Sequence, residues 1–164
     1  MKSKANFLDR DGVLNKAIVR NGKPYPPKSP AEFEILPGVK EALLQLKAAG
    51  YLLIVVTNQP DVGRGAQQQS VVDAMHDLLQ RELPLDAIYV CYHGYDGECD
   101  CRKPKPGMLI EAAKKYDIDL RQSYIVGDRS KDVDAGLAGG CCTVFIDYGY
   151  CEPLNTSPDF TTDT

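Results

Sequence analysis

The chain has 164 residues, of which 43% are hydrophobic and 26% are charged, and its formal net charge is -4. This length and composition predict one globular domain and exclude a disordered chain. The negative charge gives no general attraction for nucleic acid or an anionic membrane, and no apolar run is long enough to span a bilayer. The first residues hold too few apolar side chains for a signal peptide, so we expect a cytoplasmic protein.

Strands and helices are predicted to alternate along the chain. Continuous apolar runs are typical of strands covered on both faces, and apolar residues at helical spacing indicate helices. In chain order, we expect a strand at 5–8, a loop at 16–30, a helix at 37–49, a strand at 51–56, a helix that ends before Pro84, a strand at 86–92, a helix at 106–116, a strand at 123–126, a helix capped by Ser130 that ends at Gly139-Gly140, a strand at 142–146 and a loop-like tail. This alternation predicts a Rossmann-like α/β fold with a doubly wound parallel sheet, in a single domain at 1–164.

Two aspartates follow the first predicted strand. Asp9 and Asp11 are one residue apart, so their side chains can reach the same ligand or metal ion, and Gly12 allows the chain to turn directly after them. In a parallel α/β sheet, the carboxyl ends of the strands are where ligands bind. The alternative is an acidic turn without function, since aspartate and glycine are common turn residues.

A second polar group follows the strand at 51–56. Thr57, Asn58 and Gln59 offer hydroxyl and amide donors without added charge, which suits phosphate oxygens. Arg64 lies between two glycines and adds a fork of donors. The alternative for this segment is a polar loop with an exposed arginine.

Two more charged groups complete the pattern. Asp128 and Asp132 follow the fourth predicted strand, and Arg102 and Lys103 precede the third predicted helix. Carboxylates gathered at one sheet edge repel one another unless a cation lies between them, and oxygen ligands favour Mg²⁺. A divalent ion beside lysine and arginine can neutralise a transferring phosphoryl group, so the sequence predicts phosphoryl transfer to an aspartate followed by hydrolysis.

These groups resemble, in order, the four motifs of the haloacid dehalogenase-like phosphatases. The matching residues are Asp9-x-Asp11-Gly12-Val13, Thr57, Lys103 and Gly127-Asp128-x-x-x-Asp132, and they span nearly the whole chain. The resemblance implies that Asp9 is the nucleophile and a magnesium ligand, and that Asp11 is the general acid and base, with its backbone carbonyl on the ion. It also implies that Thr57 and Lys103 hold phosphoryl oxygens and that Asp128 completes the magnesium site. Asp132 would orient Lys103 or bind a metal water.

Further residues are similar to those of the branch that contains heptose bisphosphate phosphatase and histidinol phosphatase. They are residues 7–15, Thr57-Asn58-Gln59 with Gly63-x-Gly65, and Cys99-Asp100-Cys101-Arg102-Lys103-Pro104. Members of this branch have no large cap domain, and the spacing of the motifs leaves no room for one. Arg102 belongs to substrate binding in that branch, and we expect Asn58, Gln59, Arg64 and Arg129 to contact substrate as well. Val13 and Asn15 favour removal of the 7-phosphate of D-glycero-D-manno-heptose 1,7-bisphosphate in lipopolysaccharide precursor biosynthesis, with histidinol phosphate as the alternative substrate.

A cysteine and histidine cluster lies between the third strand and the third helix. Its members are Cys91, His93, Cys99 and Cys101. Four such ligands have the number and softness of a closed tetrahedral zinc site, so we expect a structural zinc that holds the loop presenting Arg102 and Lys103. The alternative is a set of unrelated core thiols beside a surface histidine.

Two other functions remain open at this stage. One is a zinc-stabilised interaction module without catalysis, and the other is a nucleic acid 3'-phosphatase on the same scaffold, which the negative charge disfavours. We expect a monomer that acts on a small phosphorylated sugar or amino alcohol, with no nucleic acid or membrane partner.

His76 lies off the apolar stripe of its helix and is expected to be solvated. Residues 158–160 resemble the start of the family's last strand without its closing helix, which predicts a truncated C-terminus.

Overall fold

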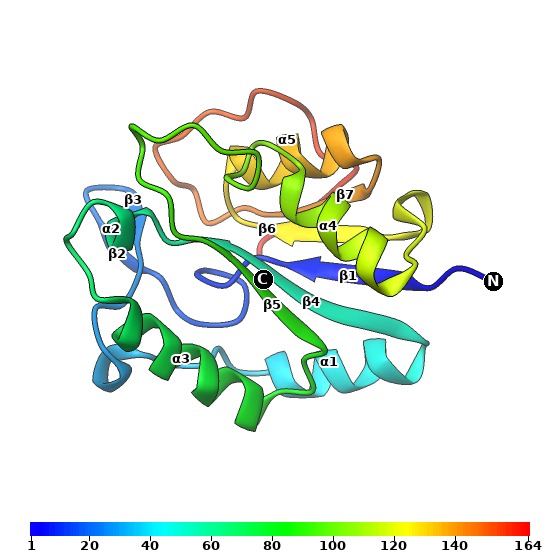
Figure 1. Cartoon of the computed structure of the whole chain (residues 1–164), viewed down its shortest axis with the longest axis horizontal. Coiled ribbons are helices and arrows are strands. Elements are labelled where there is room, and N and C mark those ends of the chain that lie inside the picture. The colour runs from blue at the N-terminus through cyan, green and yellow to red at the C-terminus, as the bar shows by residue number, and fades with distance from the viewer.

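The computed structural model describes all residues from 1 to 164 and confirms the predicted α/β class. Six parallel strands form one sheet in the order β5-β4-β1-β6-β7-β8. Helices α1 and α3 cover one face of this sheet, and α4 and α5 cover the other (Figure 1). The elements are β1 (Lys4–Leu8), β2 (Ile18–Arg20), β3 (Lys23–Tyr25), a 3-10 turn (Pro30–Glu32), α1 (Val39–Ala48), β4 (Tyr51–Asn58), α2 (Pro60–Gly63), α3 (Gln69–Glu82), β5 (Ala87–Cys91), α4 (Gly107–Tyr116), a second 3-10 turn (Leu120–Gln122), β6 (Tyr124–Gly127), α5 (Ser130–Gly139), β7 (Cys142–Ile146) and β8 (Phe160–Thr162).

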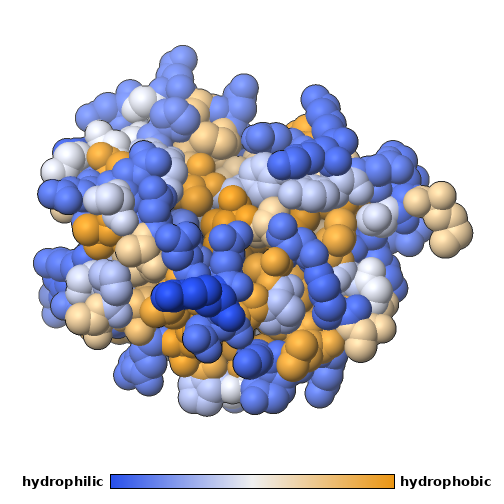
Figure 2. All heavy atoms as spheres, turned by 60° about the horizontal axis from the view of Figure 1, so that its bottom comes forward, coloured by the Kyte–Doolittle hydropathy of each residue, from blue (hydrophilic) through white to orange (hydrophobic).

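The core lies on both faces of the sheet, because successive strand residues point to opposite sides. Phe7 of β1 belongs to the apolar cluster under α4, and its neighbour Leu8 belongs to the cluster under α1 and α3. Leu109 of α4 and Met75 of α3 are almost fully buried in these two clusters. Over α1 and α3, the surface is mostly hydrophilic with small apolar patches between the polar side chains (Figure 2). No helix of the chain combines the length and the hydropathy that crossing a lipid bilayer would require.

The strand register places the chemical groups at one edge. β1 lies between β4 and β6, and Leu8 is paired with Val55 on one side and Val126 on the other. The residue after Leu8 is Asp9, whose backbone N–H donates to the carbonyl of Val126 at 3.0 Å. The end of β4 and the turn after β6 therefore flank Asp9.

Residues 16–30 are not the irregular loop that the proline content predicts. They contain the antiparallel hairpin β2–β3, in which Ile18 is paired with Tyr25. The turn is Asn21-Gly22, and both residues have positive φ angles, 52° and 75°. An Asn-Gly pair favours a tight hairpin turn of this kind, and this signal outweighed the prolines at the hairpin's edges. The hairpin still lies at the mouth of the site, as predicted.

Three smaller expectations also needed correction. A one-turn helix, α2, follows β4 in the segment for which a polar loop was the alternative interpretation. The predicted loop-like tail contains the edge strand β8, which begins at Phe160 as the motif at 158–160 suggests. Ser130 is the first residue of α5 and not its cap. The free N–H groups at this helix start are instead bound by carboxylates, since Asp132 accepts from the N–H of Arg129 and Glu152 accepts from that of Ser130.

Candidate active site

A buried lysine joins two carboxylates at the edge of the sheet. Lys103 Nζ donates to Asp9 Oδ1 at 2.9 Å, to Asp132 Oδ1 at 2.6 Å and to the carbonyl of Val56 at 2.7 Å. All three N–H groups of this ammonium are therefore used within the protein. The side chains of Lys103 and Asp132 are at most 2% exposed. Lys103 is thus a fixed positive charge beside the predicted nucleophile.

Asp128 adds a third carboxylate to this centre. Asp9, Asp128 and Asp132 each place a carboxylate oxygen within 4.8 Å of the others. Burial raises the pKa of Asp128 to about 9, and the charges of Asp9 and Asp132 add to this effect. The pKa of Asp9 is lowered, because the ammonium groups of Lys103 and Lys131 outweigh the effect of burial. The crowding therefore raises the energy of ionised Asp128 while Asp9 stays ionised.

These residues fit a magnesium ion. Asp128 Oδ1 is buried and has no hydrogen-bond partner, which is unusual for a carboxylate oxygen. An oxygen-only donor set with excess negative charge suits Mg²⁺. Asp9 and Asp128 are close enough to share an ion, whereas the Asp11 side chain does not belong to this group.

Asp11 is held by a separate set of donors. Its Oδ1 accepts from Arg10 Nη2 at 2.8 Å and from Asn15 Nδ2 at 2.9 Å, and its Oδ2 accepts from Gln59 Nε2 at 3.2 Å. The Arg10 side chain is fully buried, and its Nη1 donates to Nε2 of His76 at 3.1 Å. The prediction of a solvated His76 is therefore wrong: the residue is 7% exposed, and burial lowers its pKa to about 4.

The polar residues at the end of β4 and directly after it have different positions. Thr57 is 1% exposed, and its Oγ1 accepts from Gln59 Nε2 at 2.9 Å. Gln59 itself is buried, and its amide donates to both Thr57 and Asp11. In this structure it therefore contacts two other predicted site residues. Asn58 exchanges two hydrogen bonds with the backbone of Lys103, which fixes that residue against β4.

A pocket of about 270 Å³ opens above this centre, and both Asp9 and Asp128 line it. Its walls come from hairpin β2–β3, the turn around α2, the cysteine-containing loop and the start of α5. The residues lining it include Lys23, Tyr25, Asn58, Arg64, Tyr95, Arg129 and Lys131. Four of these carry positive charge, and four carboxylates line the same pocket, those of Asp9, Asp11, Asp61 and Asp128. The pocket therefore suits an anionic ligand together with a cation that offsets the carboxylates.

The predicted substrate residues are not all free within this pocket. Arg64 donates to Asp61 at 3.0 Å, and Arg129 is paired with Glu152 at 2.9 Å. Arg102 does not line the pocket: its Nη1 and Nη2 donate to the carbonyls of Gly94 and Gly97. In this arrangement Arg102 closes the cysteine-containing loop.

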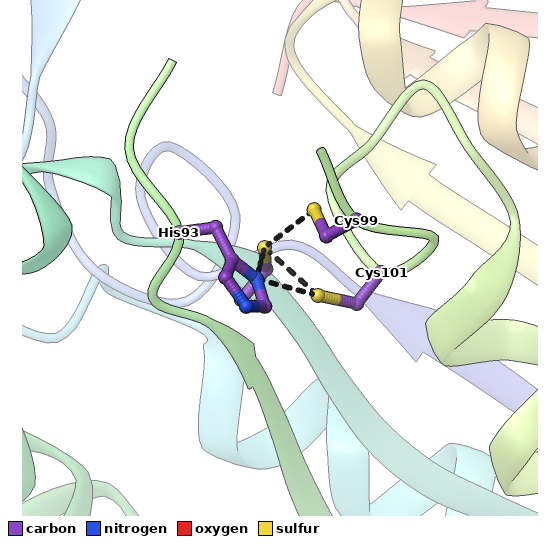
Figure 3. A group of neighbouring side chains, drawn as sticks. His93, Cys99 and Cys101 are labelled. Carbon is purple, nitrogen blue, oxygen red and sulfur yellow. Dashed lines mark hydrogen bonds between the residues drawn. The ribbon is translucent and has the colours of Figure 1, made fainter. Parts of the chain in front are cut away.

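The four predicted zinc ligands lie together. Figure 3 shows His93, Cys99 and Cys101 turned toward one another from the end of β5 and the loop before α4. Cys91 Sγ lies 3.0 Å from Cys101 Sγ, 3.8 Å from Cys99 Sγ and 3.4 Å from His93 Nδ1. Tetrahedral zinc with bonds of about 2.3 Å to sulfur separates its ligands by about 3.8 Å, so a small adjustment would accommodate the ion.

The sequence analysis missed several residues of this site. Lys131 lines the pocket beside Asp9 and Asp128. It lies three residues after Asp128 of the Gly127-Asp128 motif, and this position could have indicated a role in the site. Tyr148 and Tyr150 donate to Gly12 O and Asp128 Oδ2, at 2.6 and 2.8 Å. Nothing in their local sequence predicts these contacts.

Comparison with known proteins gives concordant results. A family model described as HAD-hydrolase-like matches residues 100–164. The chain is 38% identical over 151 residues to the D-glycero-beta-D-manno-heptose-1,7-bisphosphate 7-phosphatase of Bordetella bronchiseptica, covering 87% of this chain and 80% of that protein. It is 42% identical over 144 residues to the protein of the same name from Pasteurella multocida, covering 81% and 75%.

A solved structure supports the same relationship. The D,D-heptose 1,7-bisphosphate phosphatase of B. bronchiseptica, crystallised with magnesium and phosphate, superposes with a TM-score of 0.75 at 37% identity, covering 87% of this chain and 79% of that one. The identity and the coverage confirm the resemblance seen in the motifs and identify the protein as a phosphatase. The chain therefore belongs to the haloacid dehalogenase-like hydrolases, in the group that includes the heptose-1,7-bisphosphate 7-phosphatases.

Proposed function

We propose that this protein removes the 7-phosphate of D-glycero-D-manno-heptose 1,7-bisphosphate in a magnesium-dependent reaction. The observation that carries the proposal is the centre formed by Asp9, Asp128 and Lys103, at the floor of a pocket lined by both carboxylates and basic side chains. The relatives from B. bronchiseptica and P. multocida, which bear this activity in their names, support the choice of substrate.

In this mechanism Asp9 is the nucleophile. Lys103 binds Oδ1 of Asp9, and no donor of the protein contacts Oδ2, which is the oxygen left to attack phosphorus. The new bond joins Asp9 to the phosphoryl group as the bond between phosphorus and the sugar oxygen breaks. Magnesium held by Asp9 and Asp128 supplies charge neutralisation for the phosphoryl oxygens.

Asp11 acts first as the general acid and then as the general base. It gives a proton to the departing sugar oxygen, and it then takes a proton from the water that attacks the aspartyl phosphate and releases inorganic phosphate. Its Oδ1 accepts from Arg10 and Asn15, whereas Oδ2 has only the longer contact with Gln59. Oδ2 is therefore the oxygen better placed to carry the proton.

We further propose a zinc ion bound by the cysteine and histidine cluster described above. Cys101 is two residues from Lys103, so holding the cluster together also holds the backbone that supplies the lysine. Three thiols and one imidazole fill all four positions of a tetrahedral site and leave none for a substrate. The role of this zinc is structural.

The test is a comparison of kcat/KM for heptose 1,7-bisphosphate and histidinol phosphate, with magnesium present. We expect the heptose bisphosphate to be the better substrate, and we expect phosphate release to disappear in Asp9→Asn, which is nearly isosteric. Circular dichroism of Asp9→Asn should match that of the unmodified protein. Preference for histidinol phosphate would refute the choice of substrate, and turnover by Asp9→Asn would refute the mechanism.

A further inference from the structure

The segment at 148–152, which we call the strap, returns from β7 to the carboxylate centre (the orange loop after β7 in Figure 1). Tyr148, Tyr150 and Glu152 alternate along it, and each makes a hydrogen bond to the site. Tyr148 Oη donates to the carbonyl of Gly12 at 2.6 Å, and Tyr150 Oη donates to Asp128 Oδ2 at 2.8 Å. Glu152 accepts from the N–H of Ser130 at 3.0 Å. The strap therefore contacts the turns after both β1 and β6.

The two oxygens of Asp128 have different surroundings. Oδ2 accepts from Tyr150 Oη, whereas Oδ1 is buried without any partner. No other side chain or backbone group donates a hydrogen bond to this carboxylate in the structure. The hydroxyl of Tyr150 is thus the one donor that fixes how the carboxylate of Asp128 is rotated.

The space around Asp128 is also restricted by the turn that follows β1. A Cβ atom added at Gly12 would overlap Asp128 Oδ2, so the carboxylate packs directly against the Gly12 backbone. Tyr148 holds that backbone through the Gly12 carbonyl, and the rings of Tyr148 and Tyr150 lie 5.6 Å apart. The two tyrosines together fix the carboxylate and the surface on which it rests.

We propose that Tyr150 is a positioning residue for the magnesium site, where its hydroxyl occupies Asp128 Oδ2 and leaves Oδ1 for the ion. Partners that hydrogen-bond to a metal ligand orient that ligand, and their loss commonly lowers metal affinity by about 10–100-fold. This inference rests on the magnesium site of the proposed function, and it is independent of which sugar phosphate is hydrolysed.

The test uses Tyr150→Phe, which removes only the hydroxyl. Magnesium binding is measured without substrate by isothermal titration calorimetry, and we expect the dissociation constant to rise by about 10-fold. The matched control is Tyr89→Phe, because the Tyr89 hydroxyl is buried on β5 without a hydrogen-bond partner. Magnesium affinity of this control should equal that of the unmodified protein.

Thermal unfolding of the zinc-bound protein, without added magnesium and in excess magnesium, separates positioning from a purely structural role. A positioning role reduces the stabilisation that a given magnesium concentration provides, since this stabilisation depends on the dissociation constant. A structural role alone lowers the unfolding temperature equally in both conditions and would overturn the inference. So would unchanged magnesium affinity in Tyr150→Phe. If the unmodified protein bound no magnesium, the proposed metal site itself would fail.

Discussion

Acid should destabilise this protein through His76, and His76→Gln should remove that effect. The imidazole is buried, and its Nε2 accepts a hydrogen bond from Arg10, so it is neutral in the folded protein. Burial and the charge of Arg10 lower its pKa from 6.5 to about 4. As the pH falls from 6.5 to 4, the unfolded chain binds a proton that the folded protein does not, so the free energy of unfolding decreases. The two pKa values differ by an amount equivalent to about 3 kcal/mol, which is lost across this range.

Glutamine offers an amide oxygen to Arg10 and does not titrate. Urea unfolding followed by circular dichroism at pH 7, 6, 5 and 4 gives the free energy of unfolding of both proteins. At pH 7 the variant should be less stable by about 1–2 kcal/mol because it packs less well. The difference between the two proteins should then shrink or reverse toward pH 4, by about 3 kcal/mol in total. Parallel pH profiles would refute the argument that a neutral, buried His76 supports Arg10.

Three further perturbations test the centre and its supports. Lys103→Met leaves the carboxylates of Asp9 and Asp132 without their ammonium partner. We therefore expect kcat for phosphate release to fall by about 10²–10³-fold. Unchanged turnover in a folded variant would exclude Lys103 from the reaction. Gly12→Ala places a methyl group against Asp128 at a φ of 88°, so magnesium binding measured by calorimetry should be weakened. The control is Gly38→Ala, where φ is also positive (82°) but the space is open, and it should weaken magnesium binding less. Removal of zinc by a chelator, or Cys99→Ser, should speed proteolysis between residues 92 and 100 and reduce activity. Atomic absorption shows whether the treated protein lacks zinc. Full activity of zinc-free protein with magnesium alone would contradict a structural zinc.

Much of the fold was readable from the sequence because its parallel strands are buried on both faces. The run at 51–56 is apolar without interruption, as such a strand requires, and it corresponds to β4. The turns after β1 and β6 were equally clear, since each changes at once from apolar residues to aspartate. Strand ends of this kind converge at one edge of a parallel sheet, which is why the grouping of Asp9 with Asp128 could be expected.

The features that were missed depend on contacts between distant parts of the chain. Tyr148 reaches Gly12 across 136 positions, and no local pattern encodes that hydrogen bond. His76 lies off the apolar stripe of α3, but its polar side chain is buried because Arg10 is buried beside it. The hairpin at residues 18–25 is a different case, because its Asn21-Gly22 turn was visible and the neighbouring prolines were given too much weight.

The cysteine and histidine cluster brings together the two ends of the loop between β5 and α4. Cys91 closes β5, and Cys101 stands directly before Arg102 and Lys103. With zinc bound, residues between these ends can change in length or identity while the lysine keeps its place under Asp9. We therefore expect changes within residues 92–100 to alter the pocket wall that includes Tyr95 more than the position of Lys103.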